Sequence, residues 1–194
     1  MSNTYSLKRN NSGIFATIHH RVNVKNEKHR TVNEMAVEEL VWERLALIPD
    51  PEIPVISITE LGIVREVQYN GEQLRIVITP TYTGCPAMQV FAAEIRAAMH
   101  DMGFDDVVIE TSYSPAWTTD WITPAALGRL RQYGIAPPVK PAPGADPLAE
   151  PPVVPCPRCG SKKTTLRSRF GATACKAFYV CETCKEPFEY FKHF

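Results

Sequence analysis

Cys156-Pro-Arg-Cys159 and Cys181-Glu-Thr-Cys184 form two Cys-x-x-Cys turns near the C-terminal end of the chain. At this separation the two turns can bring four thiolates to the corners of one tetrahedron, which is the geometry of a structural zinc ribbon. The sequence between the turns has no long apolar stripe, so a bound metal would supply most of the free energy of folding. The pattern predicts a four-cysteine metal-binding ribbon over residues 156–194.

The metal in this ribbon is expected to be zinc. A zinc ribbon usually carries its second pair of cysteines in a hairpin, and residues 179–188 fit one. A fifth cysteine, Cys175, lies between the turns and leaves alternatives open. It is either a spare buried thiol or a ligand that replaces one knuckle cysteine, as in an iron–sulfur cluster. Two disulfides are a further alternative, which a reducing compartment disfavours.

Composition excludes several classes of partner. The 194 residues include 21 Lys and Arg and 21 Asp and Glu, so the net charge is zero and no basic surface for nucleic acid or anionic membranes is indicated. No apolar run has the length of a signal peptide or of a membrane span. We therefore expect a cytoplasmic protein without nucleic-acid or membrane partners.

The chain divides into four segments. Residues 1–30 are polar and basic, and we expect a disordered extension to which no function is assigned. Residues 31–135 have the patterns of a folded domain. Residues 136–155 hold nearly half of the 17 prolines and indicate an extended, semi-rigid linker before the ribbon.

Residues 31–135 predict an α+β domain. Thr31-Val-Asn-Glu34 is a capping box before a helical pattern, and Asn70-Gly71 joins two alternating segments in a predicted hairpin. A helix is expected from Pro86, a third strand over residues 107–111, and a short helix after Thr123. The expected fold is a small mixed sheet of three or more strands with helices on one face.

Cys85 is the first candidate for chemistry in this domain. It lies in Thr81-Tyr-Thr-Gly-Cys85-Pro86, directly before the predicted helix, where backbone amides and the helix dipole favour a thiolate. This position suits a reactive or metal-binding thiol. No histidine lies nearby in the sequence, which disfavours a Cys–His hydrolase. The alternative is a small buried cysteine at a helix start.

Two further pairs of residues leave alternatives open. Asp50 and Glu52 flank Pro51 in a rigid loop that is expected to present both carboxylates, either to a metal or a proton-transfer reaction or simply to solvent. Trp117 and Trp121 could form a partner-binding patch, or their rings could belong to the core.

Residues 33–112 resemble the domain of iron–sulfur assembly factors. The resemblance rests on Asp50-Pro-Glu-Ile-Pro54, on Leu61-Gly62 before a strand, and on Thr81-x-x-Gly-Cys85-Pro86. The segment from Pro115-Ala-Trp-Thr-Thr-Asp-Trp121 to Pro138 and the four-cysteine tail are similar to the PaaD family, whose members belong to bacterial phenylacetyl-CoA epoxidase systems.

The resemblance implies an accessory role in aerobic phenylacetate catabolism, beside a di-iron oxygenase and its iron–sulfur flavin reductase. The chain lacks the Glu and Glu-x-x-His helices of a di-iron site, a glycine-rich dinucleotide motif and the plant-type ferredoxin spacing, so it is not expected to be catalytic alone. By the same resemblance Cys85, with Asp50, Glu52 and Thr81, would hold iron or a cluster on its way to the oxygenase or reductase.

In that hypothesis the ribbon docks the client protein. Two alternatives remain. The chain could be a structural or regulatory subunit that binds the oxygenase through the ribbon and the region of Trp117 and Trp121. It could also be an electron-transfer subunit with an iron–sulfur cluster at the C-terminal cysteines.

Overall fold

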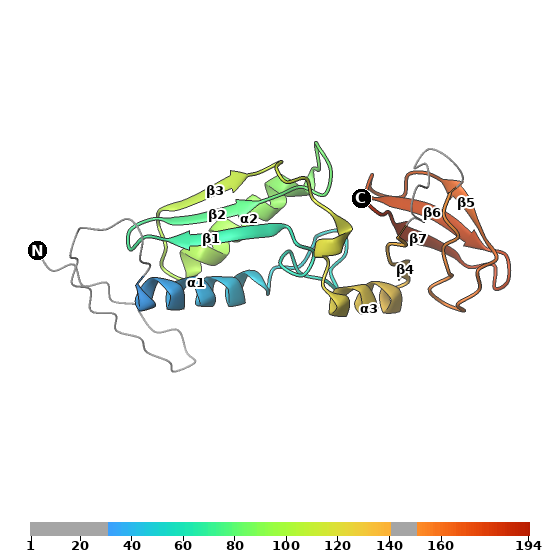
Figure 1. Ribbon diagram of the computed structural model, residues 1–194, viewed down its shortest axis with the longest axis horizontal. Helices are drawn as coiled ribbons and strands as arrows, with labels where there is room; N and C mark the ends of the chain where they lie inside the picture. Colours follow the sequence, from blue (N-terminus) through green and yellow to red (C-terminus); the bar gives the residue numbers. More distant parts are fainter. Residues whose placement is uncertain (1–30, 141–150) are drawn as a thin grey trace, which may run out of the picture.

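The computed structural model describes residues 31–140 and 151–194 (Figure 1). The predicted extension 1–30 and the middle of the predicted linker, residues 141–150, lie outside the described residues. The described chain forms two packed parts. We call residues 31–134 the α+β unit and residues 151–194 the ribbon.

The α+β unit contains a three-stranded mixed sheet. Its strands β1 (Val64–Tyr69), β2 (Leu74–Ile78) and β3 (Val107–Thr111) lie in the order β1-β2-β3. β1 and β2 are antiparallel and are joined at Asn70-Gly71, whereas β3 runs parallel to β2. The predicted hairpin and the predicted mixed sheet are both confirmed.

Two helices cover this sheet. α1 (Val32–Leu45) begins with the predicted capping box, in which Thr31 and Glu34 exchange hydrogen bonds. α2 (Ala87–Asp101) follows the Cys85 loop and crosses from β2 to β3 (Figure 1). The apolar faces of the helices bury side chains completely, for example Leu45 and Ile95. These contacts with the sheet form the main core.

The ribbon is an antiparallel sheet of β5 (Thr164–Ser168), β6 (Lys176–Cys181) and β7 (Pro187–Phe191). β6 and β7 form the predicted hairpin, and the second cysteine turn lies between them. A small separate core beneath it includes Tyr179, Phe188 and Tyr190, whose rings contact one another.

A short strand that directly follows the α+β unit completes the ribbon sheet. After the turn η1 (Thr119–Trp121), helix α3 (Pro124–Tyr133) starts at the Thr123 cap and ends at Gly134, whose φ is 97°. β4 (Ile135–Ala136) then pairs in parallel with β7, so the order of the second sheet is β4-β7-β6-β5. Figure 1 shows α3 and β4 between the two parts.

Both ends of the predicted linker belong to the ribbon, contrary to the expectation of an extended spacer over residues 136–155. Ala136 lies in β4, and the Val139 N–H donates to the hydroxyl of Tyr190. On the other side Val154 is fully buried in the ribbon core, and the Pro152 carbonyl accepts a hydrogen bond from Tyr179. Apolar burial and these hydrogen bonds fix segments whose proline content alone indicated an extended chain.

None of the helices in residues 31–140 and 151–194 combines the length and the apolar character needed to span a lipid bilayer.

Candidate functional site

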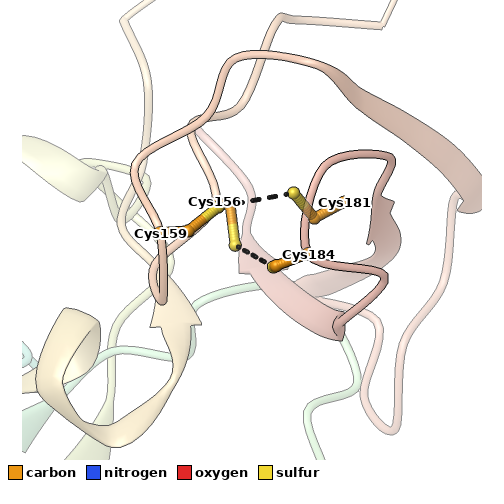
Figure 2. Close-up of side chains that lie close together, drawn as sticks. All are labelled: Cys156, Cys159, Cys181 and Cys184. Atoms are coloured by element: carbon orange, nitrogen blue, oxygen red, sulfur yellow. Dashed lines mark hydrogen bonds between the residues drawn. The ribbon is translucent and has the colours of Figure 1, made fainter.

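The four knuckle cysteines converge on one point (Figure 2). Their sulfur atoms all lie within 4.8 Å of one another. The Sγ atoms of Cys156 and Cys184 are 3.8 Å apart, and those of Cys159 and Cys181 are 3.6 Å apart. Four sulfurs bound tetrahedrally to one zinc ion at about 2.3 Å would be about 3.8 Å apart. The structure therefore places the four thiols at the spacing that a single metal ion requires.

The same geometry bears on the alternatives. A disulfide needs a sulfur–sulfur distance of about 2.05 Å, and the six cysteines of the chain are free. In an iron–sulfur cluster the thiolates bind different iron atoms and are therefore farther apart than the ligands of one ion. The observed spacing fits one tetrahedral ion best.

The two cysteine turns have the same backbone construction. The Gly160 N–H donates to the Cys156 carbonyl, and the Lys185 N–H donates to the Cys181 carbonyl, each over 2.9 Å. The residue that follows the second cysteine has a positive φ in both turns, 75° at Gly160 and 65° at Lys185. Backbone amides of Cys184 and Thr183 donate toward Cys181 and, with the neighbouring thiols, lower its pKa to about 6. Such donors favour the thiolate that a metal ion needs.

A second candidate site is a pocket of about 170 Å³ where the ribbon meets the α+β unit. We call it the shared pocket. The α+β unit contributes polar side chains from two loops, and the ribbon contributes the loop before β6. The lining includes side chains with carboxyl, hydroxyl or thiol groups, among them Asp50, Glu52, Thr81, Tyr82, Cys85 and Cys175.

Asp50 lies at one wall of the shared pocket and is only 6% exposed. Its Oδ1 accepts hydrogen bonds from the amides of Glu52 and Ile53, both at 2.8 Å, and burial raises the pKa of its carboxyl group. The alternative in which the loop simply presents both carboxylates to solvent is thus wrong for Asp50, because the proline turn folds its own amides onto that side chain. Glu52 is exposed at the rim.

Cys85 lies immediately before α2, as the sequence predicted. Its N–H donates to the Tyr82 carbonyl at 3.2 Å, and Gly84 in this turn has a φ of 83°. The thiol is half-buried and lines the shared pocket, next to the buried Thr81. Burial and the negative charges of Cys85 and Cys175 raise the pKa of Tyr82.

Cys175 lies apart from the four knuckle cysteines. Its half-buried thiol lines the shared pocket and is 3.1 Å from the Thr173 hydroxyl. Burial raises its pKa, and nearby negative charges at Cys85 and Asp50 raise it further. The structure therefore does not bring Cys175 to the knuckle site as a replacement ligand. The sequence did not predict that Cys175 shares a pocket with Cys85, because the two residues come together only where the ribbon packs against the α+β unit.

The two tryptophans differ in their surroundings. Trp117 is 5% exposed, donates its indole N–H to the Leu61 carbonyl at 3.0 Å, and contacts the rings of Phe191 and Phe194. The Trp121 ring is half-buried beneath the guanidinium of Arg65, 3.5 Å from the ring centroid. Trp117 thus binds the ribbon within the chain, in agreement with the core-packing alternative.

Comparisons with known proteins match both parts of the chain. Residues 38–109 match the family described as "Iron-sulfur cluster assembly protein", and residues 140–192 match the family described as "PaaD zinc beta ribbon domain". Two solved structures show more distant similarity. A domain of unknown function from Bacillus anthracis is 21% identical, with a TM-score of 0.47 over 50% of this chain and 94% of that chain.

The other solved structure is a Mycobacterium tuberculosis protein described as associated with Fe–S complex assembly and repair. It is 28% identical, with a TM-score of 0.29 over 57% of this chain and 94% of that chain. An Escherichia coli K12 protein, named as a putative subunit of 1,2-phenylacetyl-CoA epoxidase, is 54% identical over 153 residues, which cover 78% of this chain and 90% of that protein. At this identity and coverage, and with a matching ribbon, the chain belongs to the PaaD family.

Proposed function

We propose that this protein is an accessory subunit of a phenylacetyl-CoA epoxidase system that holds iron or an iron–sulfur cluster at Cys85 for delivery to the oxygenase or the reductase. The observation that carries the proposal is the position of Cys85, which opens into the shared pocket beside the buried carboxylate of Asp50. The match of residues 38–109 to iron–sulfur assembly proteins and the name of the E. coli relative support it.

A thiol and a carboxylate in one pocket suit iron as a cargo. Thiolates bind iron in its clusters, and a carboxylate provides a harder oxygen donor that exchanges more easily. Cys85 lies at the N-terminal end of α2, and its thiol lines the pocket. Thr81, buried beside it, would hold the loop in place.

The ribbon is assigned a zinc ion with a structural role. Four thiols at single-ion spacing form a closed site without an open coordination position, which is typical of structural zinc. The thiolates would bind the ion, and the ion would fix the two cysteine turns in the sheet. This assignment leaves the shared pocket as the place for exchangeable iron.

The test replaces Cys85 by Ser and uses Thr83→Ser, an exposed position in the same loop, as the matched control. Each form is produced together with the oxygenase and reductase, and the iron and sulfide content of both clients is measured beside co-purification. We expect C85S to bind its client but leave it poorly metallated, whereas T83S metallates it normally. Normal metallation by C85S would overturn the proposal and favour a structural or regulatory subunit.

A further inference from the structure

The shared pocket contains a thiol from each part of the chain. Cys85 comes from the loop before α2, and Cys175 comes from the ribbon loop before β6. Neither thiol belongs to the four-cysteine centre, which is the one group of three or more clustered metal-binding side chains in the described ranges. A role for Cys175 must therefore be sought at the pocket.

The ribbon holds Cys175 in place by a set of buried contacts. Lys176, only 2% exposed, pairs with Glu189 over 2.8 Å. The other carboxylate oxygen of Glu189 accepts the N–H of Ala172 at 2.8 Å, and the Cys175 carbonyl accepts the N–H of Lys192 at 2.9 Å. These contacts fix the backbone on both sides of Cys175, so the thiol is held in one position at the pocket.

The third donor is Asp50. Its Oδ1 is occupied by two amide hydrogen bonds, whereas no hydrogen bond from the described residues reaches Oδ2. Among the described residues only Thr79 Oγ1 is fully buried without a hydrogen-bond partner, so Asp50 Oδ2 stays accessible from the pocket and open to a ligand. Burial raises the pKa of both Asp50 and Cys175, and the charge of the buried Lys176 ammonium offsets part of that rise, so it would also balance negative charge in the pocket.

The two thiols and the Asp50 carboxyl lie close enough to act on one another. All three line the same pocket, and the charges of Cys85 and Asp50 add to the effect of burial on the pKa of Cys175. A small cluster accepts thiolates on separate irons, so it suits two thiols that come from different loops.

We propose that Cys85 and Cys175 together ligate a small iron–sulfur cluster in the shared pocket, with Asp50 as an oxygen donor beside it. The inference rests on the proposed function and extends it, because the ribbon supplies a ligand and closes the site. When a glutathione-bound cluster is delivered, each protein thiol forms a sulfur–iron bond and its proton leaves on a released glutathione thiol, so no oxidant or reductant is needed.

The test uses the full chain with its ribbon metal in place and a glutathione-ligated 2Fe–2S cluster as the probe, without oxygen. Wild type, Cys85→Ser, Cys175→Ser and the control Thr83→Ser are compared by visible absorbance and by iron and sulfide per chain. Thr83 is exposed and does not line the pocket. Loss of a direct ligand should cost more than the roughly 10- to 100-fold that loss of an outer-shell partner costs.

We expect C85S and C175S to lose the cluster, with zinc content unchanged, and T83S to retain it. If C85S loses the cluster while C175S keeps it with an unchanged spectrum, the role of Cys175 is refuted and the proposed function stands. If wild type takes up no cluster, both proposals fail.

A measurement on the unmodified protein removes any dependence on the folding of the variants. Iodoacetamide should label both Cys85 and Cys175 in the cluster-free, zinc-loaded chain, and mass spectrometry should find both protected once the cluster is bound. Protection of Cys85 alone would also refute the assignment of Cys175.

Discussion

The carboxylate of Asp50 is fixed by two amide hydrogen bonds, and the residue is only 6% exposed. The cost of burying it is visible as a raised pKa. A residue that destabilises the fold in its charged form and faces a pocket is typical of a functional site. At the residue scale, Asp50 therefore stands beside Cys85 as a candidate for binding the cargo.

Asp50→Asn should separate two contributions to the stability of the fold, the unfavourable burial of the charge and the favourable hydrogen bonds to the two amides. The amide oxygen can still accept from Glu52 and Ile53, but the buried charge is removed. Because the folded-state pKa of Asp50 lies above 3.8, wild type binds this proton more tightly when folded and loses stability as the pH rises from about 4 through that pKa. The melting temperature of cluster-free D50N should exceed that of wild type at pH 7 but not at pH 4. A lower value at both would show that the hydrogen bonds depend on the carboxylate.

The positive φ angles of the cysteine turns provide a second residue-scale test. An added Cβ at Gly160 meets no atom within 4 Å, so Gly160→Ala introduces backbone strain alone. We expect a cost of about 1–2 kcal/mol, or roughly 5- to 30-fold in metal affinity. Lys185→Gly, at the matching position of the other turn, should keep or improve the affinity. Chelator competition measures both, and equal effects of the two changes would contradict this interpretation.

At the scale of elements, the loop between β5 and β6 depends on Gly171. A Cβ there would lie 2.7 Å from the Glu189 carboxylate and 3.1 Å from the Lys176 side chain. The first contact would disturb the ion pair that holds the loop. In the sequence, only Cys175 and Gly171 distinguish this loop. Once β5, β6 and β7 are paired, Gly171 lies against the Glu189 carboxylate, which explains why a side chain does not fit there.

Gly171→Ala should therefore displace Cys175 and reduce cluster uptake by the zinc-loaded chain without changing its zinc content. Gly128→Ala, inside α3 where a Cβ meets nothing within 4 Å, is the matched control and should raise stability by about 0.5–1 kcal/mol. Cluster absorbance and zinc analysis provide the readouts. Unchanged uptake by G171A would mean that the loop tolerates the shift or that Cys175 is not a ligand.

For the whole molecule, several contacts join the ribbon to the preceding chain, among them hydrogen bonds from Thr118 and Thr119 to the Phe194 carbonyl. β4 pairs with β7, Trp117 packs on Phe191 and Phe194, and Cys175 enters the shared pocket. Phe191 belongs to the core of the α+β unit although it lies in a ribbon strand. The ribbon is thus part of the wall of the candidate site.

Trp117→Ala should loosen this docking at a cost of about 3–5 kcal/mol, because it removes a large buried ring and the hydrogen bond to Leu61. Tyr113, 61% exposed, provides a control whose change to Ala should matter little. Hydrogen exchange at the β4–β7 pair should accelerate in the Trp117 variant alone. Slow exchange in both would show that strand pairing holds the ribbon without the ring.

Removal of the ribbon metal also tests the contact between the ribbon and the α+β unit, this time by unfolding the ribbon. A strong chelator should unfold the two cysteine turns, since little apolar core stands beneath them, while the helices of the α+β unit persist. Loss of the Phe191 contact would expose Trp117, so its fluorescence should shift to the red as the metal leaves. Full retention of β-sheet circular dichroism after metal removal would contradict a metal-dependent ribbon.

Much of this architecture is predictable from local sequence signals, but the packing of the ribbon against the α+β unit is not. The Thr31 and Thr123 caps, the Asn70-Gly71 turn and the cysteine turns each depend on a few adjacent residues, so the mixed sheet and the ribbon hairpin follow from them. β4 is two residues long and leaves no periodic pattern, yet it orients the ribbon. The meeting of Cys85 and Cys175 depends on that orientation, which no short segment encodes.

The most direct measurement is the zinc, iron and sulfide content of wild type and Cys85→Ser, purified without oxygen, together with the visible absorbance. We predict about one zinc per chain in both forms, the number that one four-thiolate site holds, and iron with sulfide and a brown colour that depend on Cys85. Iron and sulfide that remain in C85S, with zinc absent, would place a cluster at the four knuckle cysteines and contradict the assignment of iron to the shared pocket.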